Sequence, residues 1–538
     1  MNEHFDIIII GTGAGGGTLL SRVAPSGKRV LVLERGPFLP REKENWSYKG
    51  SFKYYSSEVM YNKEGGEIRP GFSYHVGGNT KVFGAALFRL REKDFEKFRH
   101  CDGISPEWPI KYRDWQDYYT QAEQLYQVHG QGGADPTEPW RSRDYPFPPI
   151  SHEPRIAEVF ESLKARGLKP YPAPMGVRIN EAAMHLSPCI RCSTCDGYPC
   201  MVNAKSDADI LAVRPALQKP NVTLVTEAKV LRLETSVSGR EITGVLADVK
   251  GERITFTGDV VVVSCGAVNS AALLLRSAND RHPHGIANNS SGLVGRNLMK
   301  HVLGSLVAVT NAKINPSKFQ KTMAINDFYW GEPGYEFPMG NVQLMGKTVM
   351  DGLIGQEAKY APLTLEEVAQ CSVDWWLTSE DVADPKNRVT VQGDRIIIDY
   401  DTGNNAEPFA RLNERWKGIL QEIDTAANPR ATTGYFTTKM PMHSLGHQVG
   451  TCKFGEDPRA SVLDLNCRAH DVDNLYVVDG SFFISSGAVN PTLTIIANSL
   501  RVGDRLLEHL GAKAEKSRQT SSAAVHAGRM PREFALAK

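Results

Sequence analysis

The stretch DIIIIGTGAGGGTLLSRV, residues 6–23, decides the fold of this chain. Residues 6–10 form a short apolar run, which is typical of a parallel strand buried on both faces. The run leads directly into GTGAGG at residues 11–16, a G-x-G-x-x-G pattern, and a helix-like segment follows from Thr18 to Val23. A second strand-like run, Val30–Leu33, ends at an acidic residue. This order of elements predicts a βαβ unit that binds a dinucleotide.

Each position of this unit has a separate physical task. Gly11 allows the tight turn, Gly13 lets the backbone approach a pyrophosphate, and Gly16 lets helix and strand pack closely. The helix N-terminus faces the phosphates with its partial positive charge, and Glu34 stands where a carboxylate accepts from ribose hydroxyls. The motif does not separate NAD from FAD. The residues predicted here to contact the dinucleotide are Gly11, Gly13, Ala14, Gly16, Glu34 and Arg35.

Length and composition limit the possible classes. A chain of 538 residues is too long for one compact core, and 41% hydrophobic with 23% charged residues is ordinary for a globular protein. A formal net charge of +1 argues against a nucleic-acid surface. No apolar run approaches the roughly 18 residues of a membrane span. The predicted fold begins at residue 5 with no signal-like segment before it, so we expect a cytoplasmic protein.

Three further blocks complete a recognisable set. They are GGNTKVFG at residues 77–84, SCGAVNSAALLLRSA at residues 264–278, and a C-terminal block with LGHQVGT at 445–451 and VNPTLTI at 489–495. Together with the N-terminal motif, these pieces in this order resemble the glucose-methanol-choline (GMC) family of FAD oxidoreductases. Within the family, the C-terminal block is similar to the pyranose-oxidase-like and sugar dehydrogenase branch.

The resemblance implies an activity and a catalytic pair. His447 matches the family's base, which takes the hydroxyl proton while hydride passes to flavin N5, and Asn490 matches the second residue of the pair. A neutral imidazole is suited to accept a proton, and an amide can orient the substrate oxygen. The alternatives are a structural role for His447, or His443 as the base, although His443 lacks the Gly-Thr context.

The resemblance also implies further flavin contacts. In relatives with covalent flavin a histidine stands where this chain has Val82, so FAD is expected to bind non-covalently. At the next position many relatives carry Asn, and here the residue is Phe83. The remaining cofactor residues implied by the resemblance are Gly77, Gly78, Asn79, Thr80, Val230, Asp479, Gly480, Asn490, Pro491 and Thr492. The helix that opens at Pro491 would place its N-terminus at the flavin.

We expect an α/β protein: a Rossmann-type FAD-binding domain with a parallel sheet, and a substrate-binding lobe with an antiparallel sheet. The predicted boundaries are 1–110, 206–304 and 441–512 for the FAD-binding domain, 111–205 for an insertion, 305–440 for the substrate lobe, and 513–538 for a surface tail. In the lobe, Asn326–Trp330 and Trp375-Trp376 line either a sugar or aromatic-alcohol pocket or the core.

Four of the nine cysteines form a compact run. Cys189, Cys192, Cys195 and Cys200 stand at C-x2-C-x2-C-x4-C. The first three cysteines, at x2 spacing, suit an iron–sulfur cluster, whereas the x4 spacing to the fourth cysteine departs from the ferredoxin pattern, and zinc usually takes two separated C-x2-C pairs. Some GMC dehydrogenases hold an iron–sulfur cluster in this part of the chain, and other relatives keep thiols or disulfides. An iron–sulfur cluster, thiols or a disulfide, and zinc therefore stay open.

Three functions compete at this point. The first is an FAD-dependent oxidoreductase acting on the CH–OH group of an alcohol or sugar, with oxygen, a quinone or a carrier protein as acceptor. The second is a lyase on the same fold, similar to hydroxynitrile lyases, with a structural flavin. The third is a nicotinamide enzyme or binding protein, which leaves the paired His447 and Asn490 unexplained.

Overall fold

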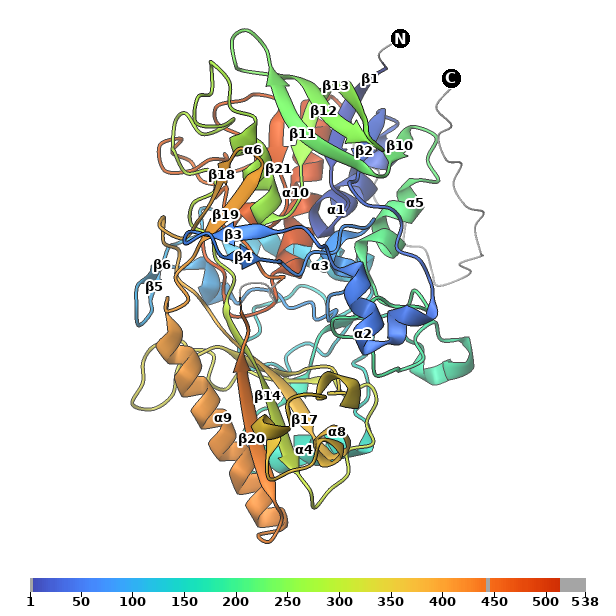
Figure 1. Cartoon of the computed structure of the whole chain (residues 1–538), viewed down its shortest axis with the longest axis vertical. Helices are drawn as coiled ribbons and strands as arrows, with labels where there is room; N and C mark the ends of the chain where they lie inside the picture. The colour runs from blue at the N-terminus through green and yellow to red at the C-terminus, as the bar shows by residue number, and fades with distance from the viewer. Residues whose placement is uncertain (1–2, 442–445, 513–538) are drawn as a thin grey trace.

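The computed structural model describes residues 3–441 and 446–512, and a seven-stranded sheet forms its upper part in Figure 1. Five strands run parallel to their neighbours: β10 (Val222–Val225), β2 (Val30–Leu33), β1 (His4–Ile10), β13 (Glu252–Val263) and β21 (Leu475–Val477). Two antiparallel strands extend the sheet beyond β13, namely β12 (Ile242–Val249) and β11 (Ala228–Thr235). The four isoleucines of β1 are buried on both sides, as the apolar run predicts.

Helices cover this sheet. Helix α1 (Ala14–Val23) packs against α10 (Thr492–His509), and α10 packs in turn against α3 (Tyr112–Leu125), as Figure 1 shows. Helix α6 (Ala267–Arg276) lies against β11. The first and last helices of the described chain therefore pack together, because each presents an apolar face to the same core.

A six-stranded sheet forms the lower part of the molecule in Figure 1. Helix α9 (Ala406–Ala427) packs on strands of this sheet and buries Trp416 against Trp375, with ring centroids 4.9 Å apart. In order, the strands are β20 (Thr433–Lys439), β14 (Val302–Thr310), β17 (Val373–Ser379), β16 (Asn341–Leu344), β15 (Met323–Ile325) and β8 (Tyr171–Pro172). All its pairings are antiparallel, and the predicted fold class is confirmed.

Smaller elements connect the two sheets. A four-stranded sheet joins residues from both halves of the chain: β18 (Arg388–Gln392), β19 (Arg395–Asp399), β3 (Met60–Asn62) and β4 (Glu67–Ile68). Two short pairs are β5 (Phe98–Arg99) with β6 (Ile104–Ser105) and β7 (Val128–His129) with β9 (Met175–Gly176). The other α-helices are α2 (Tyr48–Ser51), α4 (Pro154–Lys164), α5 (Arg214–Ala216), α7 (Glu357–Tyr360) and α8 (Leu365–Cys371).

Strands β10 and β11 are separated at Glu227, whose φ of 54° turns the chain. One local expectation differs from the structure. Helix α1 begins at Ala14, before Thr18, because the glycines at residues 15–17 already belong to its first turns. The domain boundaries stay a prediction, and both His443 and the predicted tail at 513–538 lie outside the described residues.

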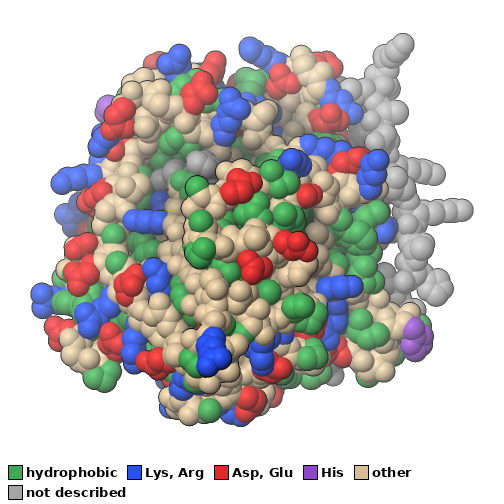
Figure 2. Space-filling view, turned by 60° about the horizontal axis from the view of Figure 1, so that its bottom comes forward, with side chains coloured by type: hydrophobic (Ala, Val, Ile, Leu, Met, Phe, Trp, Pro, Cys, Tyr) green, Lys and Arg blue, Asp and Glu red, His purple; other side chains and the backbone are tan. Residues whose placement is uncertain are grey.

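The described residues contain no helix with the length and apolar character to cross a membrane. On the face shown in Figure 2, acidic and basic side chains are interspersed, in keeping with the formal net charge of +1. The cytoplasmic location stays a prediction.

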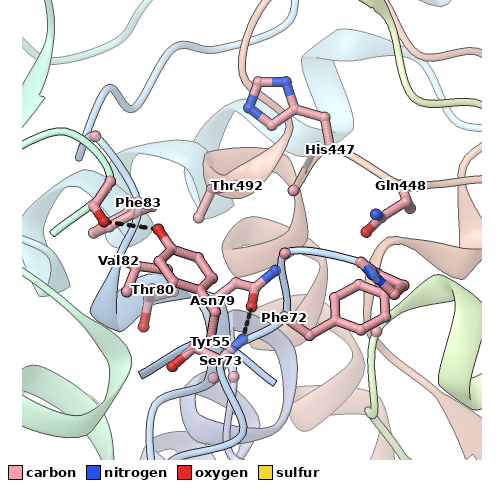
Figure 3. A pocket seen from close by; sticks show the side chains of 18 of the residues that line it. Tyr55, Phe72, Ser73, Asn79, Thr80, Val82, Phe83, His447, Gln448 and Thr492 are labelled. Carbon is pink, nitrogen blue, oxygen red and sulfur yellow. Dashed lines mark hydrogen bonds between the residues drawn. The ribbon is translucent and has the colours of Figure 1, made fainter. Parts of the chain in front are cut away.

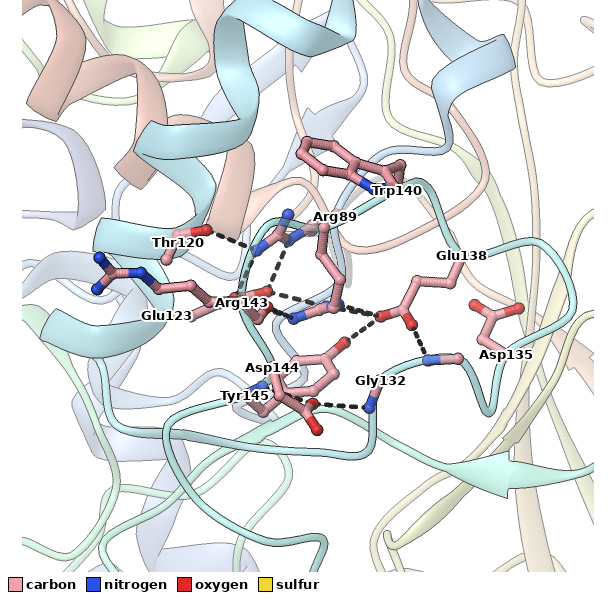
Figure 4. Close-up of polar contacts among 12 residues, drawn as sticks. Arg89, Thr120, Glu123, Gly132, Asp135, Glu138, Trp140, Arg143, Asp144 and Tyr145 are labelled. Atoms are coloured by element: carbon pink, nitrogen blue, oxygen red, sulfur yellow. Dashed lines mark hydrogen bonds and ion pairs between the residues drawn. The ribbon is translucent and has the colours of Figure 1, made fainter.

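A buried ionic network holds the chain that follows α3. Arg89 and Glu123 are each 1% exposed at the side chain and form a two-pronged ion pair, with N–O distances of 2.7 and 2.8 Å. Arg141 adds a second cation to Glu123 at 3.3 Å, and Glu138 accepts from both Arg141 and the Tyr145 hydroxyl. Figure 4 shows Arg89, Glu123, Glu138 and Tyr145 of this network, which anchors residues 132–145 to α3.

Candidate functional site

A cavity of about 960 Å³ is lined by residues from both sheets. The described residues that line it include predicted site residues from three of the four sequence blocks, together with Val230: Gly11, Gly13, Ala14, Glu34, Arg35, Gly78, Asn79, Thr80, Val230, His447, Asp479, Gly480, Asn490 and Thr492. Gly16, Gly77 and Pro491 are not among the described lining residues. The structure therefore brings most of the predicted set to one cavity.

The glycines of residues 11–16 have different surroundings. Gly11 has a φ of +97°, and a Cβ there would lie 2.3 Å from the carbonyl oxygen of Ser264. A Cβ on Gly16 would lie 2.1 Å from the carbonyl oxygen of Gly11, so helix and strand touch at this point. A Cβ on Gly13 would meet no atom within 4 Å. The fold requires Gly11 and Gly16, whereas the space at Gly13 opens toward the cavity.

The acidic residue at the end of β2 is held by the glycine loop and by the Gly36 amide. Glu34 accepts from the Thr12 amide at 3.1 Å, from the Thr12 hydroxyl at 2.5 Å and from the Gly36 amide at 3.0 Å. Burial raises the pKa of Glu34, and these hydrogen bonds oppose that effect. The neighbouring Arg35 lies over the Tyr74 ring at 3.6 Å. Glu34 thus fixes the loop as well as facing the cavity.

The second glycine block meets the first. The Gly77 amide donates to the Thr12 hydroxyl at 3.0 Å, and Gly77 has a φ of +99°. A Cβ on Gly78 would lie 3.0 Å from the Cα of Gly13, so only glycine permits this approach. Figure 3 shows His447 at the top of the pocket, with Asn79 below it.

Asp479, just after β21, caps the start of α6 and the start of the short 3-10 turn Gly480–Phe482. Its carboxylate accepts from the Gly266 amide at 2.9 Å, just before α6, and from the Ser481 amide at 2.8 Å. Burial raises the pKa of Asp479. Helix α10 begins at Thr492, and Thr492 lines the same cavity as Asp479.

His447 and Asn490 meet at the cavity wall. The Nε2 atom of His447 lies 3.4 Å from the Nδ2 atom of Asn490. Burial, with smaller effects from His301 and Lys321, lowers the pKa of His447 to about 3. The imidazole is therefore neutral at physiological pH, which is the state that accepts a proton.

Sequence reasoning missed two residues behind this pair. His301 lies 3.1 Å from His447 between their Nδ1 atoms, and Gln343 Nε2 donates to Asn490 Oδ1 at 2.9 Å. His301 and Gln343 are far from residues 447 and 490 in the sequence and belong to no recognised motif. Identifying them requires knowing which distant segments of the chain pair in three dimensions.

The cavity wall beside strand β17 is polar. Asp196 accepts from the Trp376 indole at 2.7 Å and from the Lys321 ammonium at 2.9 Å. Burial raises the pKa of Asp196, but Lys321 and the hydrogen bonds outweigh it, and the pKa is lowered overall. Trp376 lines the cavity, whereas Trp375 and Tyr329 are buried in the core. Of these three aromatic residues, only Trp376 therefore lines the cavity as predicted.

The four clustered cysteines are not arranged as a set of metal ligands in the described structure. Among the described residues, no group of three or more His, Cys, Asp or Glu side chains is placed to hold a metal ion. The sulfurs of Cys189 and Cys200 accept instead from the amides of Arg191 and Ala204, at 3.4 and 3.2 Å. Cys189, Cys192, Cys195 and Cys200 are free thiols, and burial raises the pKa of Cys195 to about 12. The iron–sulfur prediction is therefore not supported.

A βαβ dinucleotide unit beside a cavity with a His–Asn pair is typical of a dinucleotide-dependent oxidoreductase. Residues 6–303 and 383–499 match the N-terminal and C-terminal domains of the GMC oxidoreductase family. The chain belongs to the GMC oxidoreductase family.

Similar proteins match along nearly the whole chain. A 6'''-hydroxyparomomycin C oxidase of Streptomyces lividus is 29% identical, over 94% of this chain and 92% of that protein. A fructose dehydrogenase large subunit of Gluconobacter japonicus is 26% identical, over 94% of this chain and 98% of its own length. The crystal structure of pyridoxine 4-oxidase from Mesorbium loti shares the fold, with a TM-score of 0.61 and 19% identity over 94% of this chain and 99% of that chain.

Proposed function

We propose that this protein is an FAD-dependent oxidoreductase that oxidises the CH–OH group of an alcohol or sugar. One observation carries the proposal. The His447 imidazole and the Asn490 amide, 3.4 Å apart, line the same cavity as the glycine motif of a dinucleotide unit. The names of the relatives, an oxidase of 6'''-hydroxyparomomycin C and a dehydrogenase of fructose, support a sugar-like substrate.

The residues present fit FAD. The open space at Gly13 admits a pyrophosphate, the Glu34 carboxylate lies at the strand end for a ribose, and the α10 N-terminus suits negative charge. Val82 lines the cavity and has no nucleophile, which supports non-covalent binding. Bound FAD would supply the hydride acceptor for the carbon that bears the hydroxyl.

The protein's own groups prepare the hydroxyl for oxidation. The neutral His447 accepts the hydroxyl proton at Nε2, since its pKa of about 3 keeps the ring neutral and leaves one ring nitrogen able to accept. Asn490 orients the oxygen through its amide without competing for the proton. The polar wall of Asp196, Lys321 and Trp376 is suited to the remaining hydroxyls of a sugar.

An oxygen-free titration tests the proposal. The purified protein is expected to be yellow, and a sugar or alcohol from a panel should bleach its flavin absorbance. A yellow protein that no compound bleaches would favour a lyase on this fold, and a colourless folded protein would refute the proposal. Readmitting air to the bleached protein then separates an oxidase from a dehydrogenase, because rapid recovery of the colour requires oxygen as acceptor.

A further inference from the structure

A short antiparallel bridge sets His301 opposite His447. Met299 and Val449 exchange backbone hydrogen bonds at 3.0 and 2.9 Å. Two residues after Met299 the chain reaches His301, and two residues before Val449 it reaches His447, so the register makes them neighbours. Their Nδ1 atoms lie 3.1 Å apart, and their rings meet edge to face. Neighbouring histidines can share one proton in two ways, and the surroundings decide which.

The outer partner of His301 determines the direction of this hydrogen bond. His301 Nε2 lies 3.1 Å from the carbonyl oxygen of Ser486, which can only accept. The proton of a neutral His301 is therefore on Nε2, and its Nδ1 atom is an acceptor. His447 must then donate from Nδ1, so its Nε2 atom carries the free lone pair.

We infer that His301 is a positioning residue that holds His447 in the tautomer whose Nε2 atom can accept the substrate proton. The inference rests on the proposed function, and it adds a residue that touches neither substrate nor cofactor in that scheme. Burial lowers the pKa of His301, so it stays neutral and keeps its acceptor.

A chain of amides on the other side of His447 has the matching direction. The Asp135 carboxylate accepts from Asn326 Nδ2 at 2.9 Å, so Asn326 Oδ1 is left to accept from Asn341 Nδ2 at 2.8 Å. Asn341 Oδ1 accepts in turn from Gln343 Nε2 at 3.1 Å. Because a carboxylate only accepts, its position fixes the orientation of every amide in the chain.

This series of amides ends at Asn490, beside His447. Gln343 Nε2 also donates to Asn490 Oδ1 at 2.9 Å, which turns the Asn490 NH2 group toward His447 Nε2. An NH2 group is compatible with an unprotonated Nε2 and not with an Nε2–H. The two buried ends, at Ser486 and Asp135, therefore favour the same tautomer independently.

The backbone of His301 is held for this task. Its φ of 67° lies in the left-handed region, which is unfavourable for most residues. The Asp381 carboxylate compensates by accepting from the amides of Lys300 and His301 at 2.7 and 3.0 Å. The same carboxylate accepts from the Ser486 hydroxyl at 2.9 Å, so one group positions both His301 and its acceptor.

Two variants test the inference in the holoenzyme. His301→Phe keeps a ring but removes the acceptor, and the rate constant of flavin reduction should fall roughly 10- to 100-fold with FAD content unchanged. His301→Asn tolerates the left-handed backbone and offers Oδ1 as an acceptor, so it should retain most of the rate. Equal rates for wild type and His301→Phe would overturn the inference. Absence of bleaching in wild type itself would instead refute the proposed function.

A spectroscopic measurement is independent of turnover and of any variant's folding. Long-range proton–nitrogen NMR on ¹⁵N-histidine-labelled wild-type protein, with the His447 signals assigned by their loss in His447→Gln, reports which ring nitrogen carries the proton. We expect Nδ1–H and an unprotonated Nε2. An Nε2–H signal for His447 in wild type would overturn the inference even if the His301 variants do not fold.

Discussion

At the scale of single residues, the chemistry depends on keeping one imidazole neutral. Burial does most of this, because a charged ring loses solvation in the cavity wall, and His301 and Lys321 add to the effect. Asp196 acts in the opposite direction but more weakly. His447 is therefore neutral and able to accept a proton over a wider pH range, but it is a weaker base than a free imidazole.

The pH dependence of flavin reduction follows from this shift. The pKa of His447 is lowered from 6.5 to about 3, so the fraction of neutral His447 falls only as the pH drops through that lower value. Between about pH 5 and pH 8 the rate constant at saturating substrate should show no loss due to protonation of His447. Stopped-flow reduction across this range measures it. A half-loss of rate near pH 6.5 in folded holoenzyme would contradict the lowered pKa.

The residues that the sequence could predict are those within local motifs. His447 and Asn490 stand in blocks with glycine or proline beside them, and the structure brings both to one cavity. His301 and Gln343 owe their positions to the Met299–Val449 bridge and to β16, which are long-range pairings. The cysteine run shows the converse, since its spacing suggested a cluster that the three-dimensional placement does not support.

At the scale of elements, the strand–turn–helix of β1 and α1 was predictable because its order and its burial both follow from consecutive residues. The beginning of α1 was misplaced, since glycines usually weaken a helix and here they start one. Packing against the carbonyl oxygens of Gly11 and Thr12 requires the absence of side chains at Gly16 and Gly17, and this overrides their low propensity.

Two alanine substitutions separate the needs of the fold from those of the cofactor. Gly13→Ala adds a methyl group where no atom lies within 4 Å, so the protein should fold with little loss of stability. The same methyl should obstruct the approach of a pyrophosphate, and the purified variant should contain less than about a tenth of the wild-type FAD. Flavin content per folded protein, with folding judged by circular dichroism, measures this.

Gly16→Ala is the matched control. Its methyl would meet the Gly11 carbonyl oxygen at 2.1 Å, so this variant should be destabilised or insoluble before any question of FAD arises. A Gly13→Ala protein with full flavin content would show that Gly13 does not face the cofactor.

At the scale of the whole molecule, two sheets with separate hydrophobic cores enclose one cavity. The buried ion pairs of Glu123 with Arg89 and Arg141 hold the chain that follows α3. The length of the chain predicted more than one core, but not which segments join the cores. The four-stranded sheet pairs residues 60–68 with residues 388–399. No local sequence pattern predicts this contact.

Loss of the buried pair at Arg89 should weaken the entire fold. Glu123→Gln leaves the Arg89 guanidinium, 1% exposed, without its carboxylate, and the free energy of unfolding should fall by about 3–5 kcal/mol. Chemical denaturation measures the change. Glu161→Gln, which breaks an exposed pair with Lys164 on α4, should change it by less than about 1 kcal/mol. A similar loss of unfolding free energy in both variants would show that burial does not determine how much the Arg89–Glu123 pair stabilises the fold.

The most direct test of the central claim compares wild type with His447→Ala in oxygen-free stopped-flow mixing with the sugar or alcohol that bleaches the wild-type flavin. The account predicts that wild type is bleached rapidly, whereas His447→Ala keeps its yellow colour and is not measurably reduced. Reduction of His447→Ala at a rate near that of wild type would remove His447 from the mechanism and contradict the account.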